Sequence, residues 1–432
     1  MPLRGKLTLG FTLTDSGRVS VDLGQYTRAL TFLKEALQIH SEGNNSLQQL
    51  TLCYMGWAYT NLSQYSEASE FFQRALAVSS NVNRAETLNY RGLLYMRTGA
   101  YSKARQSFEQ ALVSPAPGDN PGLQGIYLNN LGLSHVKLNE NSQALKSYQK
   151  ALTLFQELDE QIGVREVLQN IAALLEQQKQ SELAIVFYKK AVNLTEEIRQ
   201  NLKKLSVSEQ RTYTETVAKT YRSLANLLLS QDRILEAQQV LDLLKVQELD
   251  DYLRNVRSSA QTIRGIDNLL PEQAILDKYG ELQKSAVQIG KELTDLRKIS
   301  EAQRTSAQQQ RIAQLVKIQA DSDQQFNQFI DSKDVQALVD QLSRTARKQS
   351  LDLESLSALK DDLRKAGNAV LLYPLILDDR LELILTTPDS PPIRRTVAVK
   401  REELNRTIVE FRSALKILAA TRKFRLKNST TG

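Results

Sequence analysis

Cysteine and histidine are nearly absent from this chain. One cysteine and two histidines occur among its 432 residues. The single thiol, Cys53, cannot form a disulfide within the chain, which fits a reducing compartment such as the cytoplasm. With His40 and His135 as the only imidazoles, a metal site built from histidine and cysteine is poorly supported. We therefore expect no metal and no other cofactor.

Turn-forming and aromatic residues are also scarce. The chain has 18 glycines and 9 prolines, and aromatic residues make up 6%. This shortage favours long helices over a strand-rich fold. No run of about 18 apolar residues occurs, so a membrane-spanning helix is not expected. The first ten residues lack the continuous apolar stretch of a signal peptide.

The positive net charge is confined to one end of the sequence. The formal charge is +7, and the stretch from Phe411 to Gly432 carries six basic residues and no acid. The other residues are therefore almost neutral. No stripe of lysine and arginine interleaved with aromatics runs through them, so nucleic-acid binding is not expected.

One pattern recurs six times in the first 256 residues. A small residue is followed sixteen positions later by a large apolar one, which alanines flank in the first five copies, while Leu244 replaces the second alanine in the last. The small residues are Gly17, Gly56, Gly92, Gly132, Ala172 and Ala225, and the large ones are Leu33, Phe72, Phe108, Tyr148, Tyr188 and Leu241.

This pattern predicts stacked pairs of antiparallel helices. A small residue lets two helices approach closely, and the large one fills the gap beside it. No pair can bury its apolar side alone, so the pairs must stack into a solenoid. Gly24 and Gly99 stand where a helix would end in a left-handed residue.

The six copies resemble the tetratricopeptide repeat (TPR) family, whose basic unit is about 34 residues. The first four spacings here are 39, 36, 40 and 40. They resemble the sub-type with extended helices that is seen in kinesin light chain. The signature tryptophan is missing from its usual place, since Trp57 follows the glycine. The resemblance implies an α-solenoid over residues 1–256 whose first helices line a concave, protein-binding groove.

Two rows of residues are candidates for that groove. The row three residues before the small position is mostly polar, and its amides Asn89, Asn129 and Gln169 could hold the backbone of an extended peptide. The alternative is that these asparagines bond to neighbouring backbone or to each other. The row one residue after the small position would take apolar side chains, and basic residues four positions further along would attract an acidic partner. The apolar row consists of Trp57, Leu93 and Leu133, and the basic residues are Arg97 and Lys137. The TPR family's carboxylate-clamp residues are absent.

A polar helical spacer is predicted over residues 257–365. It contains a heptad seam formed by Ile275, Tyr279, Leu282, Ala286, Ile289, Leu293 and Leu296. The seam favours a helical hairpin that packs on itself or on the solenoid. The alternative is a coiled coil through which the chain associates with itself.

The composition changes at residue 366 to that of an α/β segment. Residues 369–377, 381–387 and 395–399 predict two hairpin strands and a third strand, and residues 400–418 predict a helix. Strands carrying Leu371, Leu372 and Tyr373 after a TPR array resemble the CHAT proteins, which are caspase-like and frequent in cyanobacteria. Over residues 366–432 this resemblance implies an incomplete CHAT domain. We expect residues 369–432 to be poorly ordered or sticky in isolation.

The CHAT family's activity is that of a cysteine peptidase, which needs a thiolate and a histidine base after its core strands. No cysteine follows Cys53 and no histidine follows His135. Cys53 is expected to be a core or groove residue, His135 to be a packing residue and His40 to lie beyond a helix end. We therefore expect a non-catalytic scaffold. The alternative is the regulatory portion of a peptidase whose catalytic half is missing or on another chain.

Overall fold

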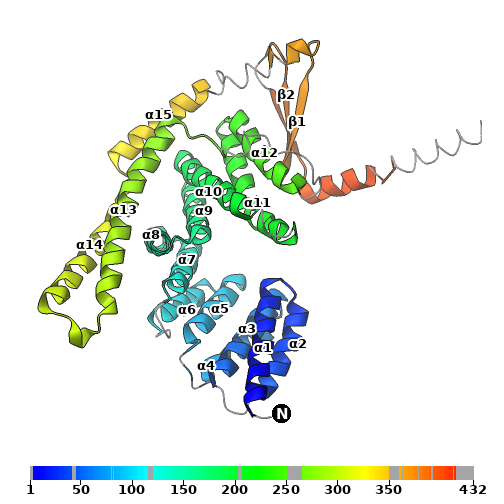
Figure 1. Ribbon diagram of the computed structural model, residues 1–432. Helices are drawn as coiled ribbons and strands as arrows, with labels where there is room; N and C mark the ends of the chain where they lie inside the picture. Colours follow the sequence, from blue (N-terminus) through cyan, green and yellow to red (C-terminus); the bar gives the residue numbers. More distant parts are fainter. Residues whose placement is uncertain are drawn as a thin grey trace, which may run out of the picture. The chain divides into compact units, whose positions relative to one another are not determined.

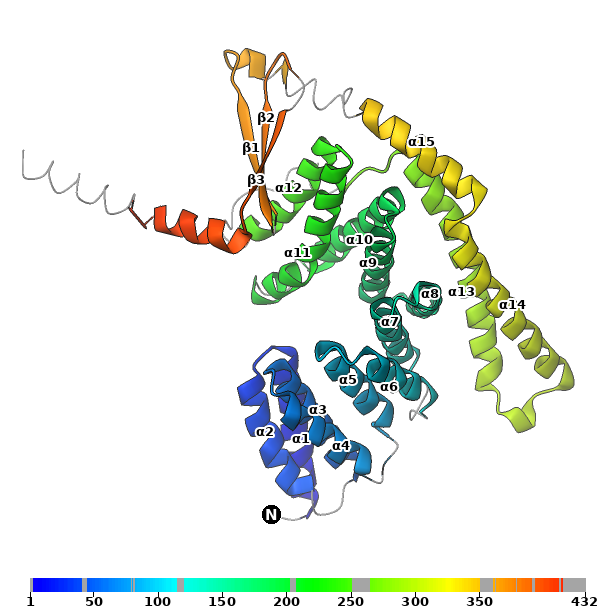
Figure 2. The same ribbon diagram turned by 180° about the vertical axis from the view of Figure 1, so that it is seen from behind.

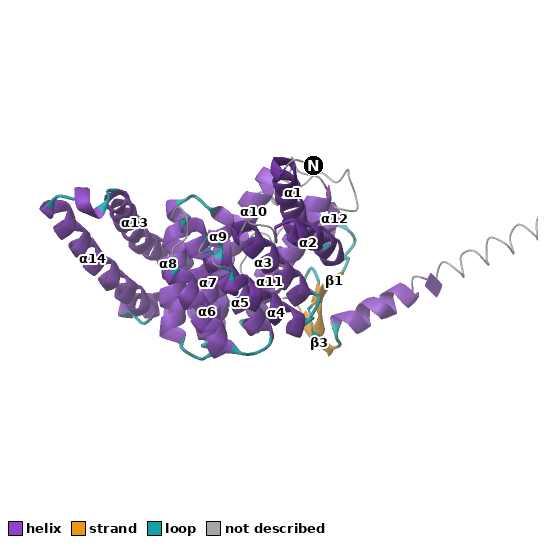
Figure 3. Ribbon diagram, turned by 90° about the horizontal axis from the view of Figure 1, so that it is seen from below, coloured by secondary structure: helices purple, strands orange, loops and turns teal. Residues whose placement is uncertain are grey.

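The computed structural model describes residues 3–40, 45–78, 80, 82–114, 120–202, 207–250, 265–349, 360–361, 363–377, 379–390, 393–411 and 413–414. The chain divides into two compact units, residues 1–194 with 270–338 and residues 195–269 with 339–432. Helices make up most of the drawn chain and the strands form one small sheet, so the predicted fold class is confirmed (Figure 3). Within the described ranges, no helix is long and apolar enough to cross a membrane.

The first twelve helices occupy the region of the six repeats (Figure 1). The last two small residues, Ala172 and Ala225, lie further apart in the sequence than the others because the two helices near residue 200 are long. The wider spacing therefore comes from extended helices and not from an additional one. The successive first and second helices are α1 (Leu3–Asp22) and α2 (Tyr26–His40), α3 (Asn45–Asn61) and α4 (Tyr65–Ala77), α5 (Arg84–Arg97) and α6 (Tyr101–Val113), α7 (Pro121–Lys137) and α8 (Asn141–Glu157), α9 (Gln161–Gln177) and α10 (Ser181–Leu202), and α11 (Val207–Ser230) and α12 (Ile234–Asp250).

The small residue of a first helix lies against the large residue of its second helix. A Cβ atom placed on Gly92 would lie 2.4 Å from Cε1 of Phe108. On Gly132 it would lie 2.5 Å from Cε1 of Tyr148. The aromatic ring thus fills the space that any larger residue would need, and this close approach holds the two helices together.

The same turn joins the helices of all six pairs. Its central residue has a positive φ and stands seven positions after the small residue. After α5, the amide of Gly99 donates to the carbonyl of Met96 and that of Ala100 donates to the carbonyl of Tyr95, which is a Schellman motif. The φ angles are 72° at Gly24, 61° at Ser63, 75° at Gly99, 60° at Asn139, 63° at Lys179 and 58° at Asp232. Only two of these six left-handed residues are glycines.

The predicted spacer contains a helical hairpin that packs on the repeats. Helices α13 (Leu270–Lys298) and α14 (Ser306–Ile330) lie side by side, and both contact α8 (Figures 1 and 2). A 3-10 turn (Glu301–Gln303) lies between them, and α15 (Lys333–Gln349) follows.

The heptad seam is turned largely into the chain itself. Ile275, Tyr279 and Leu293 are buried, while Leu282, Ile289 and Leu296 are half-buried. The Tyr279 ring lies edge-on to Phe187 of α10, with centroids 5.0 Å apart. Self-association through this seam stays a prediction, and it would require these side chains to give up contacts within the chain.

A buried ion pair fixes the hairpin on the second helices. Nζ of Lys189 on α10 lies 2.7 Å from Oε2 of Glu272 on α13, and both side chains are 0% exposed. Next to them, Nε2 of Gln283 on α13 donates to Oε1 of Gln149 on α8 at 2.8 Å. The hairpin therefore lies on the second-helix side of the array.

The strands of the second unit form an antiparallel sheet in the order β1-β2-β3. They are β1 (Leu371–Ile376), β2 (Arg380–Thr386) and β3 (Ile393–Ala398), as the sequence predicts, and residues 401–411 are helical. The basic tail from 415 onward lies outside the described residues.

Two glycine substitutions test the close-approach constraint. Gly92→Ala should lower the free energy of unfolding by about 1–3 kcal/mol, because the new Cβ overlaps the Phe108 ring. Gly280→Ala on α13 is the matched control, since a Cβ there meets nothing within 4 Å. It should raise stability by about 0.5–1 kcal/mol through helix propensity. Denaturant titration measures both, and stabilisation by Gly92→Ala would contradict the constraint.

The buried ion pair gives a second prediction. Lys189→Met should destabilise the docked hairpin by about 3–5 kcal/mol, because it leaves the Glu272 carboxylate buried without its cation. Adding Glu272→Leu should recover most of that loss. The control is Lys278→Met, whose bridge to Asp334 is 3.0 Å long but exposed and should contribute about 0–1 kcal/mol. Hydrogen exchange of the α13 amides measures each effect, and equal losses for Lys189→Met and Lys278→Met would contradict it.

Candidate functional site

The first helices of the repeats share one side of the array. α1 contacts α3, α3 contacts α5, α5 contacts α7, and α7 contacts α9. We call this side the first-helix face. The hairpin of α13 and α14 packs on α8 and α10, which are second helices. The side chains predicted to form the groove all belong to α3, α5, α7 and α9.

An aromatic and cationic cluster lies where α3 meets α5. The rings of Trp57 and Tyr90 are 5.1 Å apart and tilted by 32°. The Arg97 guanidinium lies 5.3 Å from the centroid of the Trp57 ring, in a cation–π contact. Its Nη2 also donates to Oδ1 of Asn61 at 2.9 Å. Arg97 is exposed and Trp57 and Tyr90 are half-buried, so the cluster presents both a planar apolar surface and a fixed positive charge.

A buried polar contact lies next to this cluster. The Tyr54 hydroxyl donates to Oε1 of Glu86 at 3.1 Å. Burial raises the pKa of Glu86 above its ordinary value, while the hydrogen bond from Tyr54 and the charge of Arg18 act in the opposite direction. Burial also raises the pKa of the Tyr54 and Tyr90 phenols. Both phenols therefore stay protonated at neutral pH, where Tyr54 donates its hydrogen bond and Tyr90 packs against Tyr54 and Trp57.

Asn89 and Asn129 bond to other asparagines on the neighbouring first helices. Nδ2 of Asn130 donates to Oδ1 of Asn89, and Nδ2 of Asn170 donates to Oδ1 of Asn129, both at 2.8 Å. Asn89 and Asn129 are 5% and 8% exposed. These partners are neither the neighbouring backbone nor each other, which were the alternatives named from the sequence, and the two bonds tie α5 to α7 and α7 to α9. Sequence reasoning missed Asn130 and Asn170, although the shared interval of 41 residues could have indicated them.

The remaining predicted groove residues form a more accessible row. Leu93 and Leu133 are half-buried, and each directly follows the small residue of its helix, as Trp57 does. Lys137 is exposed on α7, as Arg97 is on α5. Gln169 is half-buried on α9. The row therefore places apolar side chains on the three successive first helices α3, α5 and α7, with a basic residue four positions further along on α5 and on α7.

The cysteine and the two histidines are either buried or bonded to neighbouring side chains of the repeats. Cys53 is fully buried, and burial raises the pKa of its thiol well above the ordinary value. His40 is the last residue of α2, rather than beyond its end, and its Nε2 lies 3.1 Å from the Thr14 hydroxyl. Nδ1 of His135 lies 2.6 Å from Oε2 of Glu140. A search of the described residues finds no group of three or more His, Cys, Asp or Glu that could hold a metal ion.

Comparisons with known proteins address the repeat region. Sequence models described as tetratricopeptide repeat match residues 10–81 and 123–197, and a second such model matches residues 85–113. No model of a CHAT domain matches, so that resemblance stays a prediction. No curated protein matches the chain.

Several solved structures are similar to part of the chain. PilF of Pseudomonas aeruginosa is 16% identical, with a TM-score of 0.39, and the match covers 58% of this chain and 95% of PilF. BtubC (BKLC) of P. vanneervenii is 18% identical, with a TM-score of 0.40 and coverage of 60% and 97%. A tetratricopeptide repeat protein of Parabacteroides merdae is 19% identical, with a TM-score of 0.36 and coverage of 72% and 99%.

The small–large contact, the repeated turn and the matched sequence models agree. The chain carries tetratricopeptide repeats, over residues 10–81, 85–113 and 123–197.

Proposed function

We propose that this chain is a scaffold that binds an extended segment of a partner protein on its first-helix face and catalyses no reaction. TPR folds generally mediate protein–protein interaction, which supports the general function. The observation that carries the specific surface is the cluster of Trp57, Tyr90 and Arg97, which Leu93 and Leu133 continue onto the next helices.

The chemistry of the cluster suits protein recognition. Tryptophan, tyrosine and arginine are the residues most often found at the energetic centre of protein interfaces. The stacked Arg97 is already held by Trp57 and Asn61, so binding would cost it little further side-chain entropy. Arg97 and Lys137 carry the same charge on neighbouring helices, which favours a partner segment with acidic residues.

The row of Asn89, Asn129 and Gln169, which we call the polar strip, has a supporting role in this proposal. Asn89 and Asn129 use their side chains between helices, and so set the spacing of the apolar row. Gln169 extends the strip onto α9. Partner side chains would then pack along Trp57 and the leucines, with acidic groups facing the two basic residues.

A second function is the regulatory portion of a CHAT caspase-like peptidase. The element order of three strands followed by a helix at 401–411 favours it, because the resemblance implies that order. Sequencing the coding region downstream of the codon for Gly432 tests this idea. Further strands with a histidine and a cysteine in the same frame would support it, and a different domain there would rule it out.

Peptide binding tests the main proposal. The probe is a fluorescein-labelled 12-residue peptide in which leucine and glutamate alternate, and the measurement is fluorescence anisotropy with the full chain. Trp57→Ala should weaken binding about tenfold or more, equivalent to about 1.4 kcal/mol. Arg97→Glu combined with Lys137→Glu should weaken it further, because the charge reversal repels the acidic peptide.

The control is Lys34→Glu, which makes the same type of charge change at an exposed position on the second helix α2. It should leave the affinity nearly unchanged. Equal weakening by Lys34→Glu would show that only net charge matters. Binding that survives both Trp57→Ala and the double reversal would rule out the first-helix face.

A further inference from the structure

The sheet of the second unit has two faces of different chemistry. Residues paired across the strands share a face, and side chains alternate between faces along each strand. One face, which we call the anchored face, carries Tyr373, Glu382, Arg394 and Thr396 together with the apolar Leu371, Leu375 and Ile384. The other, which we call the outer face, consists of three cross-strand rows: Leu372, Leu385 and Ile393; Pro374, Leu383 and Arg395; and Ile376, Leu381 and Val397. Eight of these nine residues are apolar.

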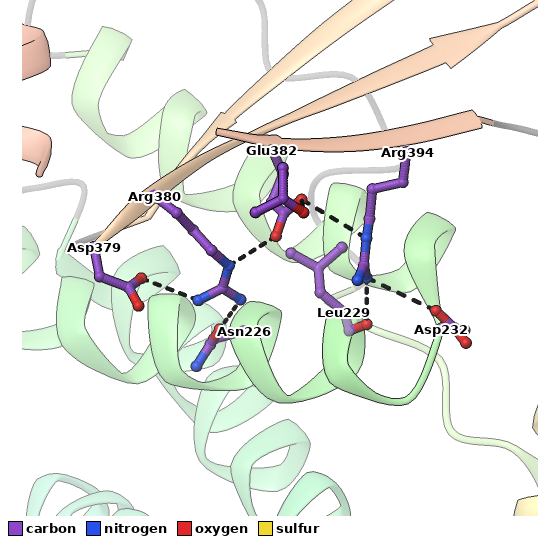
Figure 4. A network of polar contacts seen from close by, with 8 residues as sticks. Asn226, Leu229, Asp232, Asp379, Arg380, Glu382 and Arg394 are labelled. Carbon is purple, nitrogen blue, oxygen red and sulfur yellow. Dashed lines mark hydrogen bonds and ion pairs between the residues drawn. The ribbon is translucent and has the colours of Figure 1, made fainter. Parts of the chain in front are cut away.

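The anchored face contacts α11 (Figure 4). It also contacts α12, because the Tyr373 hydroxyl donates to the Asp242 carboxylate. The Glu382 carboxylate is 1% exposed and accepts from Nε of Arg380 and from the Thr396 hydroxyl, both at 2.7 Å. Arg380 also donates to the Asn226 side chain on α11. Nη1 of Arg394 donates to the carbonyl of Leu229 at 2.6 Å. This face is therefore already occupied by contacts within the unit.

The outer face is open in the described part of the chain. Leu372 is 56% exposed, and Ile393 and Val397 are each 44% exposed. β3 is also more exposed than β2. Every β3 residue is exposed or half-buried, whereas β2 alternates between buried and half-buried residues. An apolar sheet face of this kind calls for a covering group.

Of the two edge strands that the structure describes, β3 is the better suited to accept another strand. β1 contains Pro374, which has no amide hydrogen to donate to a neighbour. β3 contains no proline, and its backbone hydrogen bonds among the described residues are those of its ladder with β2. Its other amides and carbonyls point away from the sheet and form a template for pairing.

We infer that β3 is a docking edge for an extended segment of a partner protein, which adds a fourth strand to the sheet. Main-chain hydrogen bonds would supply the affinity, and alternate side chains would supply the specificity. The segment would carry apolar side chains on its outward positions, next to Ile393 and Val397, and an acidic residue next to Arg395. This surface belongs to the second unit and is separate from the first-helix face.

Arg395 determines the choice of partner. It is exposed in the middle of β3, and no ion pair joins it to another residue that the structure describes. Two copies of β3 paired antiparallel about its middle residue would place their Arg395 side chains opposite each other, and like charges on neighbouring strands are destabilising. An acidic segment from a different protein therefore fits this edge better than a second copy does.

A charge-swap experiment on the full chain tests the inference. The probes are two end-blocked peptides, Thr-Val-Thr-Glu-Thr-Val-Thr and the same peptide with lysine in place of glutamate. Hydrogen exchange should show protection of residues 393–398 by the glutamate peptide. Arg395→Glu should weaken that peptide at least tenfold and shift the preference to the lysine peptide, while Arg395→Gln should abolish the preference.

Arg406→Glu is the matched control, because Arg406 is exposed in the helical residues 401–411 and not on the sheet. It should leave the preference unchanged. The inference is overturned if neither peptide protects 393–398, if Arg395→Glu leaves the preference unaltered, or if protection appears without peptide as the protein dimerises. Protection confined to α3, α5 and α7 would assign the peptides to the first-helix face and would overturn the docking edge while leaving the proposed function intact.

Discussion

The contact between a small residue and a large one sixteen positions later sets the geometry of the repeats. Because the Phe108 ring lies where a Cβ on Gly92 would be, the two helices can come this close only without a side chain at that point. The turn seven residues after the small position then reverses the chain with the same left-handed residue in every pair. Repetition of these two features brings successive first helices into contact, and this aligns Trp57, Leu93 and Leu133.

The two sides of the array have different roles. The second helices α8 and α10 are used within the chain, because the hairpin packs on them and buries the ion pair of Lys189 and Glu272. Such a pair is costly to desolvate and costly to break, so it specifies one docked position more than it adds stability. The first-helix face keeps the exposed Arg97 and Lys137. This difference between the two sides is the main structural argument for our proposal that a partner binds on the first helices.

The sheet of the second unit likewise has one face used within the chain and one face left open among the described residues. A buried carboxylate, Glu382, gathers arginines on one face and joins that face to helices. The other face is apolar and ends at an unpaired edge with a single arginine. Together with the first-helix face, this gives two candidate surfaces that we propose for acidic partner segments. The first-helix face would contact the partner's side chains, and β3 would hydrogen-bond to the partner's backbone. Their chemistry differs enough for each to be tested alone.

The sequence by itself determined the elements and their order. The small–large period is local, so it predicts helix pairs directly, and an apolar run, an alternating stretch and a third short segment after a proline-rich break predict the three strands. It indicated the left-handed turn only where glycine marks it, as at Gly99, because other residues adopt this conformation when the Schellman hydrogen bonds compensate for it. Tertiary structure decided which polar groups meet. The bond between Asn89 and Asn130 and the pair of Lys189 and Glu272 join residues 41 and 83 positions apart. Burial and partner choice at such distances depend on how the helices stack, which no local pattern encodes.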